Sequence, residues 1–383
     1  MSNIPNEHDA DIVIGGAGPV GLTLAGLLVN HGIAPTRIAL IEGRSADKAR
    51  QDPRSIALSW GSRQILEQVG AWPVAATPIR EIHVSRRGHF GRTFIDSEEY
   101  GLPALGYVVR YGNLVAALDA SVAARGIQVI RPVQILASNE TRDSVWLNLS
   151  GQQTITATVL VQAEGGVYGD QAAKSLQRDY DQVAIVAHVR SNAAVPARAF
   201  ERFTDEGPLA LLPQDDGYSL VWCVRPASAQ HLLALDDQAF LAALQQAFGM
   251  RVGNFISSSV RQSFPLGLNA RPAASARSVA IGNAAQTLHP VAGQGLNLGL
   301  RDATVLARLL ATDVSPDALV TFMQAREADR TTTIRVTDLL ARVFASAPDG
   351  ALSQTLLGAS LGLLDLVTPA RHLLAEHMMF GRR

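Results

Sequence analysis

Apolar residues along the chain gather in short blocks separated by glycine-rich or polar turns. Residues 12–14 form one uninterrupted apolar block, and in the run over residues 37–41 four apolar residues follow Arg37. Runs of this kind are typical of parallel strands that are buried on both faces. Residues 22–29 lie between the two blocks and are predicted to start a helix. The pattern therefore predicts a strand, a helix and a second strand over residues 12–41.

A different pattern fills residues 183–224, where apolar runs are divided by turns such as Asp215-Asp216-Gly217. This spacing favours a mostly antiparallel sheet and indicates a second domain, because it interrupts the parallel pattern. Its four predicted strands cover residues 183–189, 199–203, 209–212 and 218–224. Elsewhere the pattern predicts helices over residues 55–70, 113–125, 236–250 and 295–310. It predicts further strands over residues 79–94, 107–110, 127–130, 145–149, 154–161, 263–268 and 279–281. Residues 43–53 form a polar, turn-rich stretch.

A glycine motif joins the first predicted strand to the first helix. Gly16, Gly18 and Gly21 fit the pattern G-x-G-x-x-G. The first glycine allows a tight turn, the second lets backbone N–H groups approach a pyrophosphate, and the third lets the helix pack against the strand. Glu42 ends the second strand about 20 residues further on, where an acidic residue hydrogen-bonds an adenosine ribose. The unit predicts a site for an ADP-containing dinucleotide and leaves FAD and NAD both open.

A second glycine-rich turn precedes the helix predicted from residue 295. It contains Gly293, Gly295, Leu296 and Asn297. Backbone N–H groups at a helix N-terminus stabilise negative charge, so this turn is a candidate contact for a flavin ring. The alternative is an ordinary helix cap in which Asn297 points to solvent.

Two other positions are candidates for the edge of the nucleotide site. Arg54 follows Asp52-Pro53 in a predicted loop, where its guanidinium is able to pair with a diphosphate. The alternative is a solvated surface arginine. Glu164 comes after an apolar strand, in Ala163-Glu164-Gly165, which suggests another edge of the same site.

Composition and charge exclude several classes of protein. Among 383 residues, 47% are apolar and 17% charged, and the net charge of −1 predicts no nucleic-acid partner. Cys223 is the only cysteine, so we predict no disulfide framework and no cysteine-based metal site. The polar N-terminus does not resemble a signal peptide, and no apolar run reaches membrane-spanning length. We therefore expect a cytoplasmic protein.

At this point the motifs resemble those of a known family, the group A FAD-dependent aromatic hydroxylases. The shared motifs are residues 16–21 with Glu42, Asp52-Pro53-Arg54, Ala163-Glu164-Gly165 and residues 282–302. Residues 105–109, 201–213 and 364–371 are similar to the hydroxylases of ubiquinone biosynthesis, which act on 2-polyprenylphenols. The resemblance spans nearly the whole chain.

The resemblance implies an α/β fold with three parts. A discontinuous, Rossmann-like FAD-binding domain would contain residues 1–75, 100–175 and 265–345. An inserted, mostly antiparallel substrate domain would contain residues 76–99 and 176–264. A C-terminal helical segment would contain residues 346–383.

The resemblance also implies cofactor contacts. Gly16, Gly18 and Gly21 would carry the FAD diphosphate, and Glu42 would hold the adenosine ribose. Arg54 would lie near the diphosphate and the path of NAD(P)H.

Around the flavin, the resemblance assigns further contacts. Asn283 would hold the ribityl chain, and Pro290 would lie near the reactive edge of the isoalloxazine. The residues that would line the ring are Gly293, Gly295, Leu296 and Asn297.

The chain departs from the family pattern at three places. Glu164 replaces an aspartate, and Tyr168 and Asp170 stand where the motif usually closes with serine and arginine. Asn283 replaces an aspartate, and Gln286 replaces a histidine. The first two departures, at Glu164 and at Tyr168 and Asp170, concern the use of NAD(P)H more than the binding of FAD.

The implied reaction is hydroxylation of a phenol ring. NAD(P)H would reduce FAD, O2 would form a flavin C4a-hydroperoxide, and its distal oxygen would pass to the ring. No acid–base pair is assigned. Leu211 and Trp222 are candidates for the wall of the substrate site, with the core of the sheet as the alternative.

Other functions compete with this interpretation. A flavin-binding scaffold protein of the same pathway and an FAD-dependent reductase of an isoprenoid substrate both stay open. Ser360 lies in a G-x-S-x-G pattern, but its flanks are helical in pattern, unlike a hydrolase nucleophile elbow. His372 and His377 are five residues apart, which does not suit a helical zinc pair, and we predict no metal site.

The C-terminal stretch over residues 352–367 is apolar, with leucines at helical spacing. It suggests a peripheral contact with the inner face of a membrane or with a biosynthetic complex, and packing on the protein itself is the alternative. A homo-oligomer also stays open.

Overall fold

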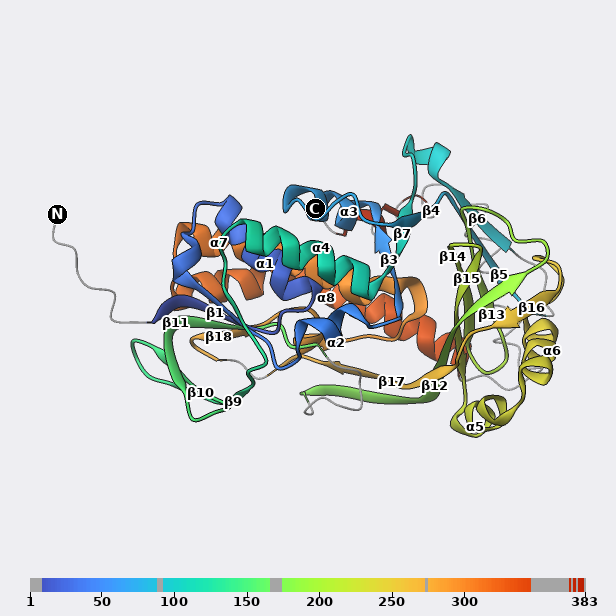
Figure 1. Ribbon diagram of the computed structural model, residues 1–383. Coiled ribbons are helices and arrows are strands. Elements are labelled where there is room, and N and C mark those ends of the chain that lie inside the picture. Colours follow the sequence, from blue (N-terminus) through green and yellow to red (C-terminus); the bar gives the residue numbers. More distant parts are fainter. Residues whose placement is uncertain are drawn as a thin grey trace.

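The computed structural model describes residues 9–87, 92–165, 174–272, 275–345, 372, 375, 376 and 378–381. Their strands form sheets of seven, nine and three strands. Figure 1 shows the seven-stranded sheet and its helices at one end of the molecule and the nine-stranded sheet at the other. The predicted α/β class is confirmed.

The seven-stranded sheet contains the predicted strand–helix–strand unit. β1 (Ala10–Gly15) is buried along its whole length and pairs in parallel with β2 (Ile38–Ile41) and β11 (Thr154–Gln162). The order is β8 (Val129–Ile130), β2, β1, β11, β10 (Val145–Leu149) and β9 (Ile135–Glu140), with β18 (Ser278–Ala280) also beside β11. α1 (Pro19–Asn30) packs against α4 (Tyr111–Ala124) and α7 (Gln294–Thr312).

The nine-stranded sheet confirms the predicted antiparallel block. Its order is β19 (Gln286–Thr287), β17 (Gln262–Ala270), β12 (Leu176–Ser191), β15 (Gly217–Val224), β14 (Pro208–Gln214), β13 (Arg198–Phe203), β5 (Glu81–Arg86) and β6 (Arg92–Asp96), with β16 (Phe255–Ser258) beside β12. Neighbouring strands run antiparallel except β5 and β13, which are parallel. α5 (Pro226–Ala234) and α6 (Asp237–Phe248) lie on the side away from α1 and α7 (Figure 1).

The third sheet corrects one prediction. Residues 55–59 were expected to begin a helix, but they form β3 (Ser55–Ser59), and only α3 (Trp60–Gln68) is helical. β3 pairs with β7 (Gly106–Arg110), which also pairs with β4 (Ala76–Ile79). Tertiary pairing therefore overrides the local pattern at this position.

Three other helices were not predicted. They are α2 (Ala46–Arg50), α5 and α8 (Pro316–Ala345). α2 lies within the stretch that was expected to form turns, and the Ser45 side chain caps it.

α8 is joined to α7 through buried charges. The Asp302 carboxylate, which is fully buried, accepts hydrogen bonds from Arg326 Nε at 2.8 Å and Arg330 Nη2 at 2.8 Å.

The division into domains remains a prediction. β17 and β19 belong to the nine-stranded sheet, although most of β17 and all of β19 fall within residues 265–345, which were assigned to the FAD-binding domain. The apolar stretch over residues 352–367 and Ser360 lie outside the described residues. None of the helices in the described part is long and apolar enough to cross a membrane.

Candidate cofactor and substrate site

The first glycine turn leaves room for a ligand next to the start of α1. Gly16 has φ +104°, and a Cβ atom there would lie 2.7 Å from Ala163 O. A Cβ atom at Gly21 would overlap Gly16 O, so the third glycine is needed for the turn itself. At Gly18 the nearest atom to such a Cβ is Tyr111 Oη at 3.4 Å, and no side chain caps α1. The N-terminus of α1 therefore faces open space, as anion binding requires.

Glu42 lies at the edge of this turn, as predicted. Its Oε2 accepts a hydrogen bond from the Ala17 N–H at 2.9 Å, and its Oε1 accepts one from the Arg44 N–H at 2.9 Å. Only 8% of the residue is exposed. A carboxylate has about four acceptor positions, so capacity is left for a ligand hydroxyl.

Glu164 lies on the other side of the same turn and is exposed to solvent. The pKa of its carboxyl group is raised, first because packed atoms reduce its hydration and second because the Glu42 carboxylate repels its charge. Tyr168 and Asp170, the other departures in this motif, lie outside the described residues.

Arg54 is held in place near the first glycine turn. Its Nη2 and Nε donate to the Asp52 carboxylate at 2.6 and 2.9 Å, and its guanidinium lies over the Tyr111 ring at 5.2 Å. The hydrogen bond to Asp52 raises the pKa of Arg54. Tyr111 was not identified from the sequence. Its hydroxyl lies beside Gly18 and accepts a hydrogen bond from Arg44 at 3.4 Å, so it links Arg54 to the turn.

The second glycine turn repeats the arrangement at α7. Gly293, the residue before the helix, has φ +59°, and no side chain caps the helix. A Cβ atom at Gly295 would meet only Asn283 Oδ1 at 3.9 Å. α7 and the turn before it cross α1 closely, because a Cβ atom at Gly299 would lie 2.7 Å from a Val20 methyl group. The two uncapped helix N-termini therefore belong to a pair of packed helices.

Asn297 does not point to solvent. Its Oδ1 accepts a hydrogen bond from the Ser59 N–H at 2.9 Å, and its Nδ2 donates to Ala57 O at 3.2 Å and Gly293 O at 2.7 Å. The residue is 2% exposed. The side chain thus joins β3 to the second glycine turn. Leu296 packs against the main hydrophobic core.

A buried histidine shapes the loop that carries Pro290. His289 Nδ1 accepts a hydrogen bond from the Val291 N–H at 3.1 Å, so the proton belongs on Nε2, which lies 3.0 Å from Gln182 Oε1. Gln182 Nε2 in turn donates to Glu206 O. Burial lowers the pKa of His289 to about 4. The loop is therefore tied to the nine-stranded sheet by a neutral histidine.

The two residues predicted for the substrate wall lie on the α6 side of the nine-stranded sheet. Leu211 is fully buried and Trp222 is 6% exposed, both in the cluster that includes Phe240 of α6. They lie on the outer face of the nine-stranded sheet, where Trp222 also lines a cavity of about 620 Å³. The opposite face approaches the Pro290 loop, since Val84 and Phe203 pack against Val291. Both residues therefore lie in the core of the sheet, the alternative given for them, and their part in a substrate wall stays a prediction.

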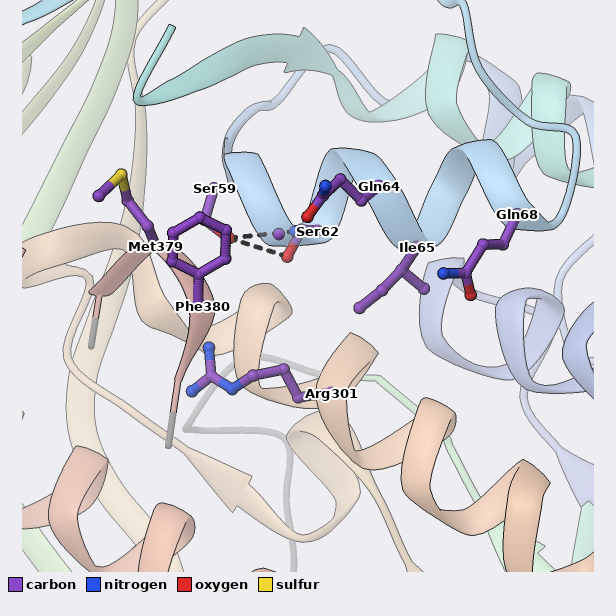
Figure 2. A pocket seen from close by; sticks show the side chains of 9 residues that line it. Ser59, Ser62, Gln64, Ile65, Gln68, Arg301, Met379 and Phe380 are labelled. Carbon is purple, nitrogen blue, oxygen red and sulfur yellow. Dashed lines mark hydrogen bonds between the residues drawn. The ribbon is translucent and has the colours of Figure 1, made fainter. Parts of the chain in front are cut away.

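A smaller cavity of about 170 Å³ lies between α3, α7 and the described C-terminal residues (Figure 2). Arg301 lines it, and its Nε donates to Asp329 Oδ2 at 3.0 Å. Met379 and Phe380 form its other wall, and Gly61 allows their close approach, because a Cβ atom there would lie 2.7 Å from Met379 O. Met379 and Phe380 thus lie against the start of α3.

These features fit a dinucleotide ligand that contacts the protein at both glycine turns. The first turn combines an uncapped helix N-terminus with a carboxylate, and the second offers another uncapped N-terminus on a packed partner helix. A ligand with a diphosphate, an adenosine ribose and a polar ring system matches this set of groups.

Comparisons with known proteins agree with this description. The family model described as FAD binding domain matches residues 9–337. Ubiquinone hydroxylase UbiL of Rhodospirillum rubrum is 31% identical over 97% of this chain and 89% of its own length. The 3-demethoxyubiquinol 3-hydroxylase of Escherichia coli is 31% identical over 81% of each chain.

A solved structure shows the same fold. The p-nitrophenol 4-monooxygenase PnpA from Pseudomonas putida matches with a TM-score of 0.74 at 14% identity, over 98% of this chain and 99% of that one. Together with the family match over most of the chain, these likenesses establish the relationship. The chain belongs to the FAD-binding-domain family and is an FAD-dependent monooxygenase of the aromatic hydroxylase group.

Proposed function

We propose that this monooxygenase hydroxylates the ring of a polyprenylated phenol in ubiquinone biosynthesis, with NAD(P)H as electron donor. The observation that carries the proposal is the 31% identity to a ubiquinone hydroxylase over 97% of the chain. Bound FAD would supply the redox chemistry and the activation of O2. The protein would bind and orient the reactants and would exclude water from them.

The first glycine turn would hold the adenine half of the cofactor. Gly18 provides the open space beside the α1 N-terminus for the diphosphate, and Glu42 has acceptor capacity for the ribose. Arg54, fixed by Asp52 and Tyr111, would add positive charge nearby.

The second glycine turn would hold the flavin half. Gly295 and the backbone of Asn297 lie at the start of α7, where N–H groups stabilise negative charge on a ring. Asn283 Oδ1 approaches Gly295 and would hold the ribityl chain. Pro290, held by His289, would close the reactive edge and help to exclude water.

The first experiment is visible absorption spectroscopy of the FAD-loaded protein under anaerobic conditions. NADPH and NADH are added separately, with and without a short-chain prenylphenol. We expect the flavin absorption to bleach faster with the phenol, and ¹⁸O2 to label the product after air is admitted. A flavin that neither donor reduces would favour the scaffold alternative, and a product without ¹⁸O would favour a reductase.

Contact of the C-terminal segment with a membrane or a biosynthetic complex is a separate hypothesis, drawn from residues 352–367. Cosedimentation of the full chain with anionic and neutral liposomes tests the membrane contact. Binding to neither kind would contradict it. Sedimentation velocity of the same sample reports whether the chain forms a homo-oligomer.

A further inference from the structure

Glu201 lies in the middle of β13, within a row of residues that crosses the nine-stranded sheet. Its register partners are Val84 on β5 and Ala210 on β14. The row continues through Val221 on β15 to Val186 on β12. Residues paired in register present their side chains on the same face of a sheet. Glu201 is therefore the single ionisable residue among these five, the other four are apolar, and the row ends at Thr93 on β6 and Gln262 on β17.

This row lies on the face that approaches the Pro290 loop. Val84 packs with Phe203 against Val291 and against Leu340 of α8. Leu211, next to Ala210 on β14, points the opposite way, toward α6. All five members of the row are partly accessible. The described side chains thus leave part of this face uncovered at the place where the flavin edge is proposed.

The surroundings of Glu201 are apolar and nearly free of charge. Within the described residues, its carboxylate has neither a hydrogen bond nor an ion pair. Burial raises the pKa of Glu201 to about 7. A carboxylate without a partner in such surroundings is costly to bury, and buried groups of this kind are candidates for functional sites.

Few other ionisable groups share this face. Cys223 lies nearby on β15, and burial together with the Glu201 charge raises the pKa of its thiol well above the usual value. Arg86 is two residues beyond Val84 on β5, and α8 contributes Leu340 with Thr337 one turn before it. β14 contributes Pro208, Ala210 and Leu212, and β12 contributes Ala184 and Val186. His188, two residues beyond Val186 on β12, also lies on this face, 3.9 Å from the Asp216 carboxylate in the exposed turn. Glu201 is the ionisable group within the apolar row.

We propose that Glu201 is a catalytic residue that accepts a hydrogen bond from the substrate phenol and removes its proton during hydroxylation. This inference rests on the proposed function. The phenol O–H bond breaks, its proton goes to a Glu201 oxygen, and its electron pair enters the ring, which becomes more nucleophilic at the ortho and para carbons. After oxygen transfer, the hydroxylated carbon releases its proton to solvent and its C–H electron pair restores the aromatic ring, while Glu201 gives its proton to the phenol oxygen. The carboxylate is then restored.

The same row explains how the substrate would be oriented. A hydroxyl bound at Glu201 lets the ring lie across Ala210 and Val221 and directs it toward Val291. The reacting carbon would then face the Pro290 loop. A carboxylate with a pKa near the working pH is well matched to this proton transfer.

The test compares the FAD-loaded wild type with Glu201→Gln and Glu201→Asp. The matched control is Asp216→Asn, because Asp216 lies in an exposed turn of the same sheet, outside the row, where it pairs with Arg190 and lies 3.9 Å from His188. Flavin content and circular dichroism confirm that each variant is folded. Hydroxylated product, NAD(P)H consumption and H2O2 release are measured from pH 5.5 to 9 with a short-chain prenylphenol.

We expect Glu201→Gln to lower the kcat of hydroxylation by about 10²- to 10⁴-fold and to release H2O2 instead of product. The wild-type rate should rise with pH through about 7, because the active form is the carboxylate. This rise should disappear in Glu201→Gln and persist in Glu201→Asp. The methyl ether of the phenol, which has no proton to give, should react equally slowly with wild type and Glu201→Gln.

Two results would overturn the inference in different ways. If wild type hydroxylates the phenol and Glu201→Gln keeps the same kcat and pH profile, Glu201 is not the base. If wild type hydroxylates no prenylphenol but is reduced by NAD(P)H, the proposed function fails, and the assignment of Glu201 fails with it.

Discussion

Gly18 and Gly21 lie in one turn, yet the structure gives them different tasks. A Cβ atom at Gly21 would overlap the Gly16 carbonyl, whereas one at Gly18 would touch only the Tyr111 hydroxyl. Gly21 is therefore required by the protein's own packing, and Gly18 by the space that the cofactor is proposed to occupy.

This difference predicts separate effects of two substitutions. Gly18→Ala should leave the melting temperature of the FAD-free protein within about 4 °C of wild type and weaken FAD binding at least about tenfold, a loss of ~1.4 kcal/mol. Gly21→Ala should prevent stable folding. Fluorescence titration with FAD and thermal melts measure the two effects. If Gly18→Ala binds FAD with wild-type affinity, the diphosphate does not lie beside Gly18.

Glu201 also has a measurable consequence for stability. Its folded pKa of about 7 exceeds the ordinary value of 4.5. The raised pKa contributes stability that is complete below pH 4.5 and is lost as pH rises through 7. Glu201→Gln should therefore stabilise the FAD-free protein at pH 8 relative to wild type by about 1–3 kcal/mol, after allowance for partial exposure.

Urea unfolding at pH 5 and pH 8 measures this change. The difference between wild type and Glu201→Gln should grow between the two pH values, and Asp216→Asn should show no such growth. A difference that stays constant with pH would mean that the carboxyl group is not desolvated in the folded protein.

At the scale of elements, β3 depends on a side chain far along the chain. Asn297 supplies hydrogen bonds to Ser59 N, Ala57 O and Gly293 O while almost fully buried. Residues 55–70 look like one helix in sequence, and only pairing with β7 and capture by Asn297 make the first part a strand. Such contacts are invisible to local patterns.

Asn297→Ala should destabilise the FAD-free protein by about 2–4 kcal/mol, because buried backbone groups of β3 lose their partners. Chemical denaturation without FAD measures the loss. Asn297→Asp, which keeps the acceptor for Ser59 N–H but loses the donor, should lie between Ala and wild type. Unchanged stability in Asn297→Ala would show that the side chain serves the cofactor alone.

At the scale of the whole molecule, the Pro290 loop and the nine-stranded sheet are joined by a chain of hydrogen bonds through His289 and Gln182 to Glu206. Gly207 makes this possible, because a Cβ atom there would lie 2.5 Å from Gln182 Nε2. The link places the proposed flavin edge against the face that carries Glu201.

The hydrogen bonds through His289 should contribute less to the stability of the folded protein in acid. The folded pKa of His289 is about 4 and its ordinary value is 6.5, so the unfolded chain binds the proton first and stability falls as pH decreases from 6.5 to 4. The loss for this one group is about 3 kcal/mol. His289→Gln, measured by urea unfolding at pH 7 and 4.5, should show a smaller loss than wild type.

His83 provides the reference for this experiment. Its pKa is also lowered to about 4, first by burial and then by Arg251, Arg92 and Arg198, but it takes no part in the link. His83→Asn should flatten the pH dependence of stability without changing flavin reduction. An equal effect of His83→Asn and His289→Gln on flavin reduction would contradict the proposed role of the loop.

Spacing and periodicity are enough to predict the parts of this protein whose physics is local. The glycine turn, Glu42, the parallel strands and the alternating strands follow from these patterns, and the FAD family followed from the resemblance of the motifs. Which sheet face meets the Pro290 loop depends instead on how distant elements pack. Alternation along β14 and β15 separates two faces without saying which one meets the loop, so it could not tell that Leu211 and Trp222 face α6 or that Glu201 lies on the other face. Burial, pKa and side-chain partners arise from elements far apart in the chain, and for this reason Tyr111, Gln182 and Glu201 became visible only in the folded molecule.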